Sequence, residues 1–206
     1  MLRKIQERTY NRLIEKINKG ITKGIDLAIG KDVTSIKNFV DNQRLLHPEL
    51  NRNELVDRLI NKKKWRAAIV SFAYGLGGFW TLVPNLAHIW RIHGRLVLTI
   101  AYTCGYDLND PELRHDIFVC FALSSGCEEL KKILSEAGNV MWKKALLTPV
   151  MKRIIKRLPN RIITLAARRS LVNVTKITPV GGAIVGSIVD FFSTAAIGKA
   201  AKFYYC

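Results

Sequence analysis

Apolar residues recur at helical spacing along the first 66 residues of the chain. They follow one another mostly at three- and four-residue steps, with Lys and Arg on the other positions of the same turns: Ile5, Tyr10, Leu13, Ile14, Ile17, Ile21 and Ile25. This period predicts a basic amphipathic helix. A second helix is predicted to begin at Pro48, with Leu50, Leu55, Leu59 and Ile60 on its inner face, and to end at the basic, aromatic run 62–65.

The pattern changes after residue 66. No Asp, Glu, Lys or Arg occurs in the 24 residues 67–90. A helix of that length would cross about 30 Å of hydrocarbon, but glycines at 75, 77 and 78 and Pro84 interrupt it. We therefore predict a helical hairpin: one helix to Tyr74, a glycine-rich turn, and a second helix from Pro84 to Cys104 that stops at Gly105. Asp110-Pro111-Glu112 predicts the start of the next helix, which runs towards Gly126.

The remaining sequence alternates cations with aliphatic residues over 143–169 and is small and apolar over 177–198, where Asp190 is the one charge. Gly182 and Gly186 have the four-residue spacing that lets helices pack closely. The one β-like run is 172–175. The predicted fold is all-α, a multi-helix bundle with apolar helical hairpins and basic amphipathic helices. We divide it into a basic amphipathic helical arm, 1–66, and a helical domain, 67–206, with apolar segments 67–90 and 177–198.

Charge and apolarity are both high and lie in different parts of the chain. The formal charge is +17, yet 49% of residues are hydrophobic, which excludes a disordered basic tail. Residues 1–66 carry a net +8 and residues 131–176 a net +11, whereas residues 67–130 carry a net −3. This segregation favours an anionic membrane surface. A soluble nucleic-acid-binding module is the alternative, although no helix-turn-helix, RNP or zinc-finger pattern supports it.

The cysteines and histidines indicate neither a metal site nor catalysis. The four cysteines and four histidines show no CxxC or HExxH spacing, so no metal and no cofactor is expected. Four cysteines in a chain of this length do not form a disulfide framework, and a reducing cytoplasm is expected. No nucleophile–base or paired-carboxylate arrangement stands out, so the chain is not predicted to be an enzyme.

Two groups of cations are candidates for binding anionic headgroups. In the helix 84–104, His88, Arg91 and Arg95 fall on one stripe with Asn85, Thr99 and Tyr102, and guanidinium groups bind phosphate oxygens in pairs. The competing interpretation is a solvated face, or internal pairing with Asp107, Asp110 or Glu112. The second group is the basic helical block, with Lys152, Arg153, Lys156, Arg157, Arg161, Arg168 and Arg169. Asp190, an acid in an apolar segment, is expected to pair with one of the arginines.

Two stretches carry a resemblance to a known family. Leu82-Val83-Pro84 leads through Leu96 to Ala101-Tyr102, followed by Gly105-Tyr106-Asp107 and Asp110-Pro111-Glu112. The tail holds Pro179-Val180-Gly181-Gly182-Ala183, Gly186, Ile197-Gly198, Ala200-Ala201 and Tyr204. Together they resemble the central and C-terminal signatures of the EcsC-like family, with Cys104 where that family commonly has Tyr.

The resemblance implies a bacterial, helical, membrane-associated protein without a settled catalytic activity, in some cases encoded beside an ABC transporter. Anionic membrane lipids are the expected partners, an ABC transporter or another membrane protein is a further candidate, and the oligomeric state stays open. We expect the chain on the cytoplasmic side of the membrane, with peripheral binding and insertion through apolar hairpins both open. The predicted function is non-enzymatic binding of anionic phospholipid surfaces, with a role as accessory or regulator of a membrane system such as a transporter.

Overall fold

The computed structural model describes residues 26, 30, 32–76, 82–110, 113–125 and 179–206. Every secondary-structure element in these ranges is a helix, and the all-α prediction is confirmed. The arm before residue 26, the β-like run 172–175 and the basic block 143–169 lie outside the described residues. The helices are α2 (Val33–Leu46), α3 (Arg52–Leu76), α4 (Leu82–Thr103), α5 (Leu113–Ser124) and α8 (Pro179–Tyr205).

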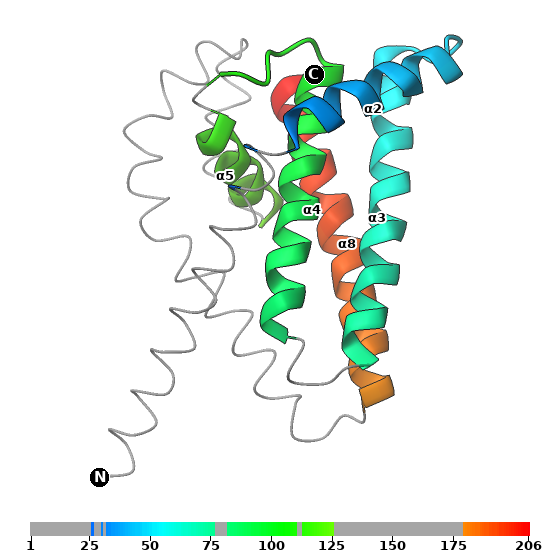
Figure 1. Ribbon diagram of the computed structural model, residues 1–206, viewed down its shortest axis with the longest axis vertical. Coiled ribbons are helices and arrows are strands. Elements are labelled where there is room, and N and C mark those ends of the chain that lie inside the picture. The colour runs from blue at the N-terminus through cyan, green and yellow to red at the C-terminus, as the bar shows by residue number, and fades with distance from the viewer. Residues whose placement is uncertain (1–25, 27–29, 31, 77–81, 111–112, 126–178) are drawn as a thin grey trace.

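Three long helices form the body of the molecule. Figure 1 shows α3, α4 and α8 side by side along the longest axis, with α2 across their upper end and α5 beside α4. The chain descends along α3 and ascends along both α4 and α8, so α8 packs antiparallel to α3. The main core lies in the upper part, where Leu96 and Ile100 of α4, Ile117 of α5 and Tyr204 of α8 are fully buried.

Helix α3 begins later and ends later than the sequence predicted. Asn51 Oδ1 accepts a hydrogen bond from the Glu54 backbone N–H (3.0 Å), and the Glu54 carboxylate accepts one from the Asn51 N–H (2.9 Å). This reciprocal capping sets the helix start at Arg52, so the prediction of a start at Pro48 was wrong. The helix then continues through the basic run 62–65 to Leu76. The expected boundary between residues 66 and 67 therefore falls within one helix.

The predicted break between two apolar helices is confirmed, since α3 ends at Leu76 and α4 begins at Leu82. Helix α4 ends at Thr103, one residue before the predicted end, and the chain turns at Gly105 as predicted, where a φ of +95° favours glycine. The N–H of Gly105 donates to the Tyr102 carbonyl (3.1 Å) and the N–H of Tyr106 to the Ala101 carbonyl (3.0 Å). These two bonds satisfy carbonyl groups of the last helical turn and direct the chain towards α5.

The ends of α4 and α8 meet at a disulfide that the cysteine spacing did not indicate. It links Cys104 to Cys206, whose Cα atoms are 5.7 Å apart and whose positions differ by 102 residues. Cys120 of α5 is a buried free thiol. The pairing depends on the two helix ends lying together, and a count of cysteines carries no information about that.

Helices α3 and α8 approach most closely at two glycines. A Cβ added at Gly198 would lie 2.7 Å from a side-chain atom of Ile60, and one at Gly75 would lie 2.4 Å from the Cα of Ala183. At Gly186, in contrast, a Cβ would meet nothing within 4 Å. The close packing expected around Gly186 is therefore found instead at the Gly75–Ala183 crossing.

Candidate functional site

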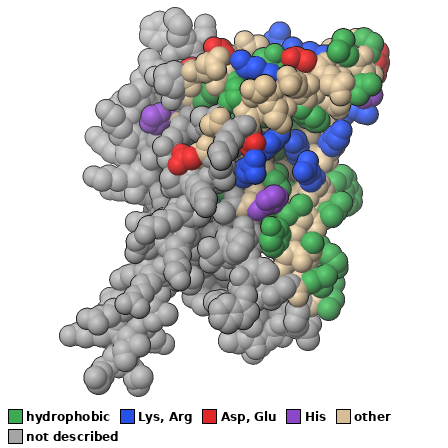
Figure 2. Space-filling view, viewed as in Figure 1, with side chains coloured by type: hydrophobic (Ala, Val, Ile, Leu, Met, Phe, Trp, Pro, Cys, Tyr) green, Lys and Arg blue, Asp and Glu red, His purple; other side chains and the backbone are tan. Residues whose placement is uncertain are grey.

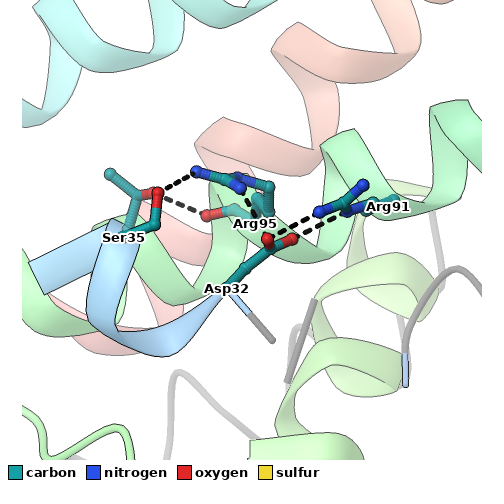
Figure 3. Close-up of polar contacts among 5 residues, drawn as sticks. Asp32, Ser35, Arg91 and Arg95 are labelled. Atoms are coloured by element: carbon teal, nitrogen blue, oxygen red, sulfur yellow. Dashed lines mark hydrogen bonds and ion pairs between the residues drawn. The ribbon is translucent and has the colours of Figure 1, made fainter. Parts of the chain in front are cut away.

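The stripe of α4 that holds the candidate arginines faces the start of α2. Asp32, directly before α2, accepts hydrogen bonds from Arg91 Nε (2.8 Å) and Nη2 (2.7 Å), and Arg95 Nη1 lies 2.8 Å from the same carboxylate. Figure 3 shows the Asp32 side chain between the two guanidinium groups, with Ser35 accepting a hydrogen bond from Arg95 (3.1 Å). The arrangement ties α2 to α4 across 59 residues of sequence.

The Asp32 carboxylate is buried and charged. Burial by itself raises the pKa of a carboxyl group, but the hydrogen bonds and positive charges of Arg91 and Arg95 outweigh it and hold the pKa of Asp32 below its ordinary value. An Asp in the position before a helix commonly accepts a hydrogen bond from the first backbone N–H groups. Asp32 makes no such bond, because its side chain turns to the arginines.

The rest of the α4 stripe also contacts α2 or its own helix. Tyr102 Oη donates a hydrogen bond to Asp41 (3.3 Å), and Thr99 Oγ1 donates to the Arg95 carbonyl (2.6 Å). Asp107, which the sequence offered as a partner for the arginines, lies instead 3.6 Å from the Lys37 ammonium. The arginines precede Asp107 by more than three helical turns, whereas Asp32, directly before α2, lies against both of them.

Helix α3 adds further cations to the arginine pair. Lys63 is 8% exposed, and burial lowers its pKa to about 8, helped by the positive charges of Arg95, Arg66 and Lys62 and opposed by Asp32. Each of the three cations acts on Lys63 more strongly than Asp32 does. Lys63 is therefore surrounded by more positive than negative side chains. We call Lys62, Lys63, Arg66, Arg91 and Arg95 the cationic cluster.

His88 lies beside this cluster and is neutral at pH 7. Burial and the charges of Arg91 and Arg66 hold its pKa below the ordinary value. Within the described part of the chain, Lys62 and Arg66 pair with no carboxylate, and both are exposed. Figure 2 shows Lys and Arg side chains across the middle of this face, directly above a hydrophobic lower right edge. Two exposed cations without a carboxylate partner among the described residues, of which Lys62 lies 5.3 Å from the centre of the Phe39 ring, thus accompany a partly neutralised pair of arginines.

Asp190 is the second buried acid, and its partner is not an arginine as predicted. Ser71 Oγ donates a hydrogen bond to Asp190 Oδ2 across the α3–α8 contact. Burial raises the pKa of Asp190 to about 6, and the bond from Ser71 opposes this rise. The arginines on α4 face α2, whereas Asp190 faces α3, and this is why the expected pair does not form.

Two further sets of polar side chains are hydrogen-bonded within the core. His93 Nε2 and Thr194 Oγ1 share a hydrogen bond (3.0 Å) between α4 and α8, and burial lowers the pKa of His93 to about 4. Tyr204 and Tyr205 donate to the two carboxylate oxygens of Asp116 (2.9 and 3.0 Å). No group of three metal-ligating side chains gathers among the residues that the structure describes.

The whole chain, residues 1–206, matches the model of the EcsC protein family. The chain belongs to the EcsC protein family. Searches of the curated proteins and of the solved structures found no match to this EcsC-family chain. The family assignment confirms the resemblance that the two signatures indicated.

The structure brings His88, Arg91 and Arg95 of this EcsC-family chain together with cations that the sequence analysis did not predict as site residues. Lys62, Lys63 and Arg66 precede His88 by more than twenty residues, and the sequence analysis interpreted the basic run 62–65 as a helix end. A continuous helical period through residues 59–71 was the signal that places them on α3. The seven candidates of the basic block, from Lys152 to Arg169, lie outside the described residues.

Proposed function

We propose that this chain is a non-enzymatic membrane-associated protein that binds anionic phospholipid surfaces through the cationic cluster. The observation that carries the proposal is the placement of the exposed Lys62 and Arg66 around the buried Lys63, with no ion pair to a carboxylate among the described residues. Cations that repel one another in the free protein gain most from a surface of phosphate groups. The two exposed cations without a carboxylate partner, Lys62 and Arg66, are the first to reach such a surface.

The surroundings of the cluster favour a membrane over a nucleic acid. Trp65 follows the cations directly and is exposed, as are the apolar side chains below it on α3. Tryptophan beside Lys and Arg is typical of the headgroup level of a bilayer. A nucleic-acid surface would meet the cations equally well but would leave the adjoining apolar side chains in water.

Flotation with lipid vesicles tests the proposal. Vesicles of phosphatidylcholine with phosphatidylglycerol should carry the protein upward, vesicles of phosphatidylcholine alone should not, and rising salt should weaken the binding. The double substitution Lys62→Gln/Arg66→Gln removes two cations worth about 1 kcal/mol each, so we expect a loss of about thirtyfold in partitioning. Arg52→Gln, which removes an exposed cation at the first residue of α3, is the control away from the cluster and should keep its binding.

Two results would overturn the proposal. One is equal binding to neutral and anionic vesicles, or none to either. The other is tighter binding to duplex DNA than to anionic vesicles at the same salt concentration, which would establish the nucleic-acid alternative.

A further inference from the structure

The lower part of the α3–α8 pair exposes apolar side chains that a protein in water would bury. On α3 they recur at steps of four, three and four residues, which is one helical stripe: Trp65, Ile69, Phe72 and Leu76. The described part of α8 exposes six more over the same length: Val180, Ile184, Val185, Ile188, Val189 and Phe192. We call these ten side chains the exposed apolar face. Figure 2 shows hydrophobic side chains along this edge of the molecule.

The part of the exposed apolar face on α3 and the part on α8 lie at the same height along the helix pair. At the upper level the rings of Trp65 and Phe191 meet edge to face with centroids 4.9 Å apart, and the Lys64 ammonium lies 4.9 Å above the Phe191 ring. At the lower level Gly75 contacts Ala183. Cations therefore border the face at its upper end, while its lower end coincides with the lower ends of both helices.

The height of the face matches half a bilayer. Trp65 and Leu76 are eleven residues apart, so the stripe is about 16 Å long, and one leaflet of a bilayer offers about 15 Å of hydrocarbon. From Ala67 to Leu76, below the cationic cluster, α3 carries no charged residue. The one charge of α8 in this part, Asp190, turns inward and bonds to Ser71. The Asp190 carboxylate and the Ser71 hydroxyl therefore point away from the surface that hydrocarbon would contact.

The upper part of α8 argues against a crossing of the whole bilayer. Ala183–Tyr205 is long and apolar enough to span, judged by length and composition alone. However, its second half is buried against the other helices, with Ile197, Ala201 and Tyr204 in the core, and Lys202 pairs with Asp57 of α3 (2.8 Å). Exposing this half to lipid would take the bundle apart. The exposed length therefore ends near Phe192.

We propose that the lower part of the α3–α8 pair inserts into the hydrocarbon of a single membrane leaflet, down to Leu76 and Val180, with the cationic cluster at the headgroup level. This insertion rests on the proposed function, and it specifies how deeply the protein enters the membrane and which end faces the hydrocarbon. The occupant of the exposed apolar face is lipid rather than a second copy of the chain, because the cations at its upper end would repel those of an aligned copy and attract phospholipid headgroups.

Depth-dependent quenching of tryptophan fluorescence tests the geometry with the full chain on vesicles of phosphatidylcholine and phosphatidylglycerol. Leu76→Trp, at the lower end of the face, should be quenched more by a nitroxide near the bilayer centre than by one near the headgroups. Phe192→Trp, beside the cations, should show the reverse. The signal is taken as the difference from the unsubstituted chain, and Leu45→Trp on α2, 80% exposed, should be quenched by neither.

Substitutions on the face supply a second measurement. Ile69→Glu and Ile188→Glu change side chains that are 67% and 51% exposed, so the soluble fold should persist. Each should lower the fraction of bound protein that withstands a high-salt wash by at least about tenfold, because a carboxylate is costly in hydrocarbon. Leu45→Glu is the matched control and should leave that fraction unchanged.

Different results contradict the insertion and the proposed function. Binding to anionic vesicles that salt removes completely, with both tryptophan probes shallow, would overturn the insertion and leave the function standing. Equal insertion into neutral and anionic vesicles would overturn the function and leave the insertion standing. A solution dimer that Ile69→Glu and Ile188→Glu dissociate, without any change in vesicle binding, would show that the face is an interface between copies.

Discussion

The two parts of the α3–α8 helix pair differ in where they place their apolar side chains. In the upper part, Ile60 packs on Gly198, and Ile197 and Tyr204 are buried. In the lower part, Phe72 and Ile188 project from the same two helices into the surroundings. One helix pair therefore contributes to the protein core at one end and exposes apolar side chains at the other.

The difference follows from what packs around the pair. In the upper part α4, α5 and α2 surround it, and acids such as Asp116 find donors on neighbouring helices. In the lower part the outward faces of α3 and α8 meet no other described helix, and the acid Asp190 bonds to a hydroxyl within the pair. The comparison teaches that the hydrophobicity of a helix does not decide whether its side chains are buried, because burial depends on which other helices pack around it.

Two matched substitutions on α8 should show the largest difference in the free energy of unfolding between the upper and the lower part. Ile197→Glu places a carboxylate at a site that is 6% exposed and should lower the free energy of unfolding by more than about 4 kcal/mol. Ile188→Glu makes the same change in the lower part and should alter it by less than about 0.5 kcal/mol. Urea titrations measured by circular dichroism give both values. Equal losses would mean that the lower part is core as well.

The next effect concerns Asp32, the acid beside the upper part. Asp32→Asn leaves two guanidinium groups without their carboxylate and should lower the free energy of unfolding by about 3 kcal/mol, since both arginines are partly exposed. The matched control is Asp41→Asn on the same α2 segment, where the ion pair to Arg44 is long (3.8 Å) and exposed. That control should cost below about 1 kcal/mol. Identical values for the two variants would show that the Asp32 pairs contribute nothing particular.

Replacing Asp190, the acid of the lower part, should raise the free energy of unfolding, whereas replacing Asp32 should lower it. Burial raises its pKa to about 6 from an ordinary 3.8, so the folded protein binds more protons than the unfolded chain between those pH values. The free energy of unfolding should therefore fall as pH rises through this window and level off above it. Asp190→Asn should abolish the fall and stabilise the protein at pH 7 by about 2 kcal/mol. A destabilised Asn variant would contradict the assignment.

The smallest effect concerns Lys63, which lies between the upper and the lower part, and its contribution to the affinity for anionic vesicles. Because the pKa of Lys63 is about 8, its charge is lost as pH rises through that value, and affinity for anionic vesicles should fall by about fivefold. Lys63→Met should bind about fivefold more weakly at pH 7 and show no such fall, so the two proteins should converge above about pH 9. Parallel pH profiles would exclude Lys63 as the titrating group.

Local sequence determined which segments are helical and where they stop. Three features act within a few residues of sequence: the capping by Asn51 and Glu54, the glycine at position 105 and the uncharged run after residue 66. Their effects can therefore be predicted from the sequence. The family signatures are equally local, and they led to the correct family. The start of α3 was misplaced because two competing caps, Pro48 and Asn51, lie three residues apart.

Only the tertiary structure decided which residues meet. Asp32 is 59 residues from Arg91, and Ser71 is 119 residues from Asp190, so neither pair leaves a periodic trace in the sequence. The same holds for the cationic cluster, which joins α3 to α4, and for the exposure of Ile188 against the burial of Ile197. Helical period specifies that a face is apolar, but which helices cover it depends on how the whole chain packs.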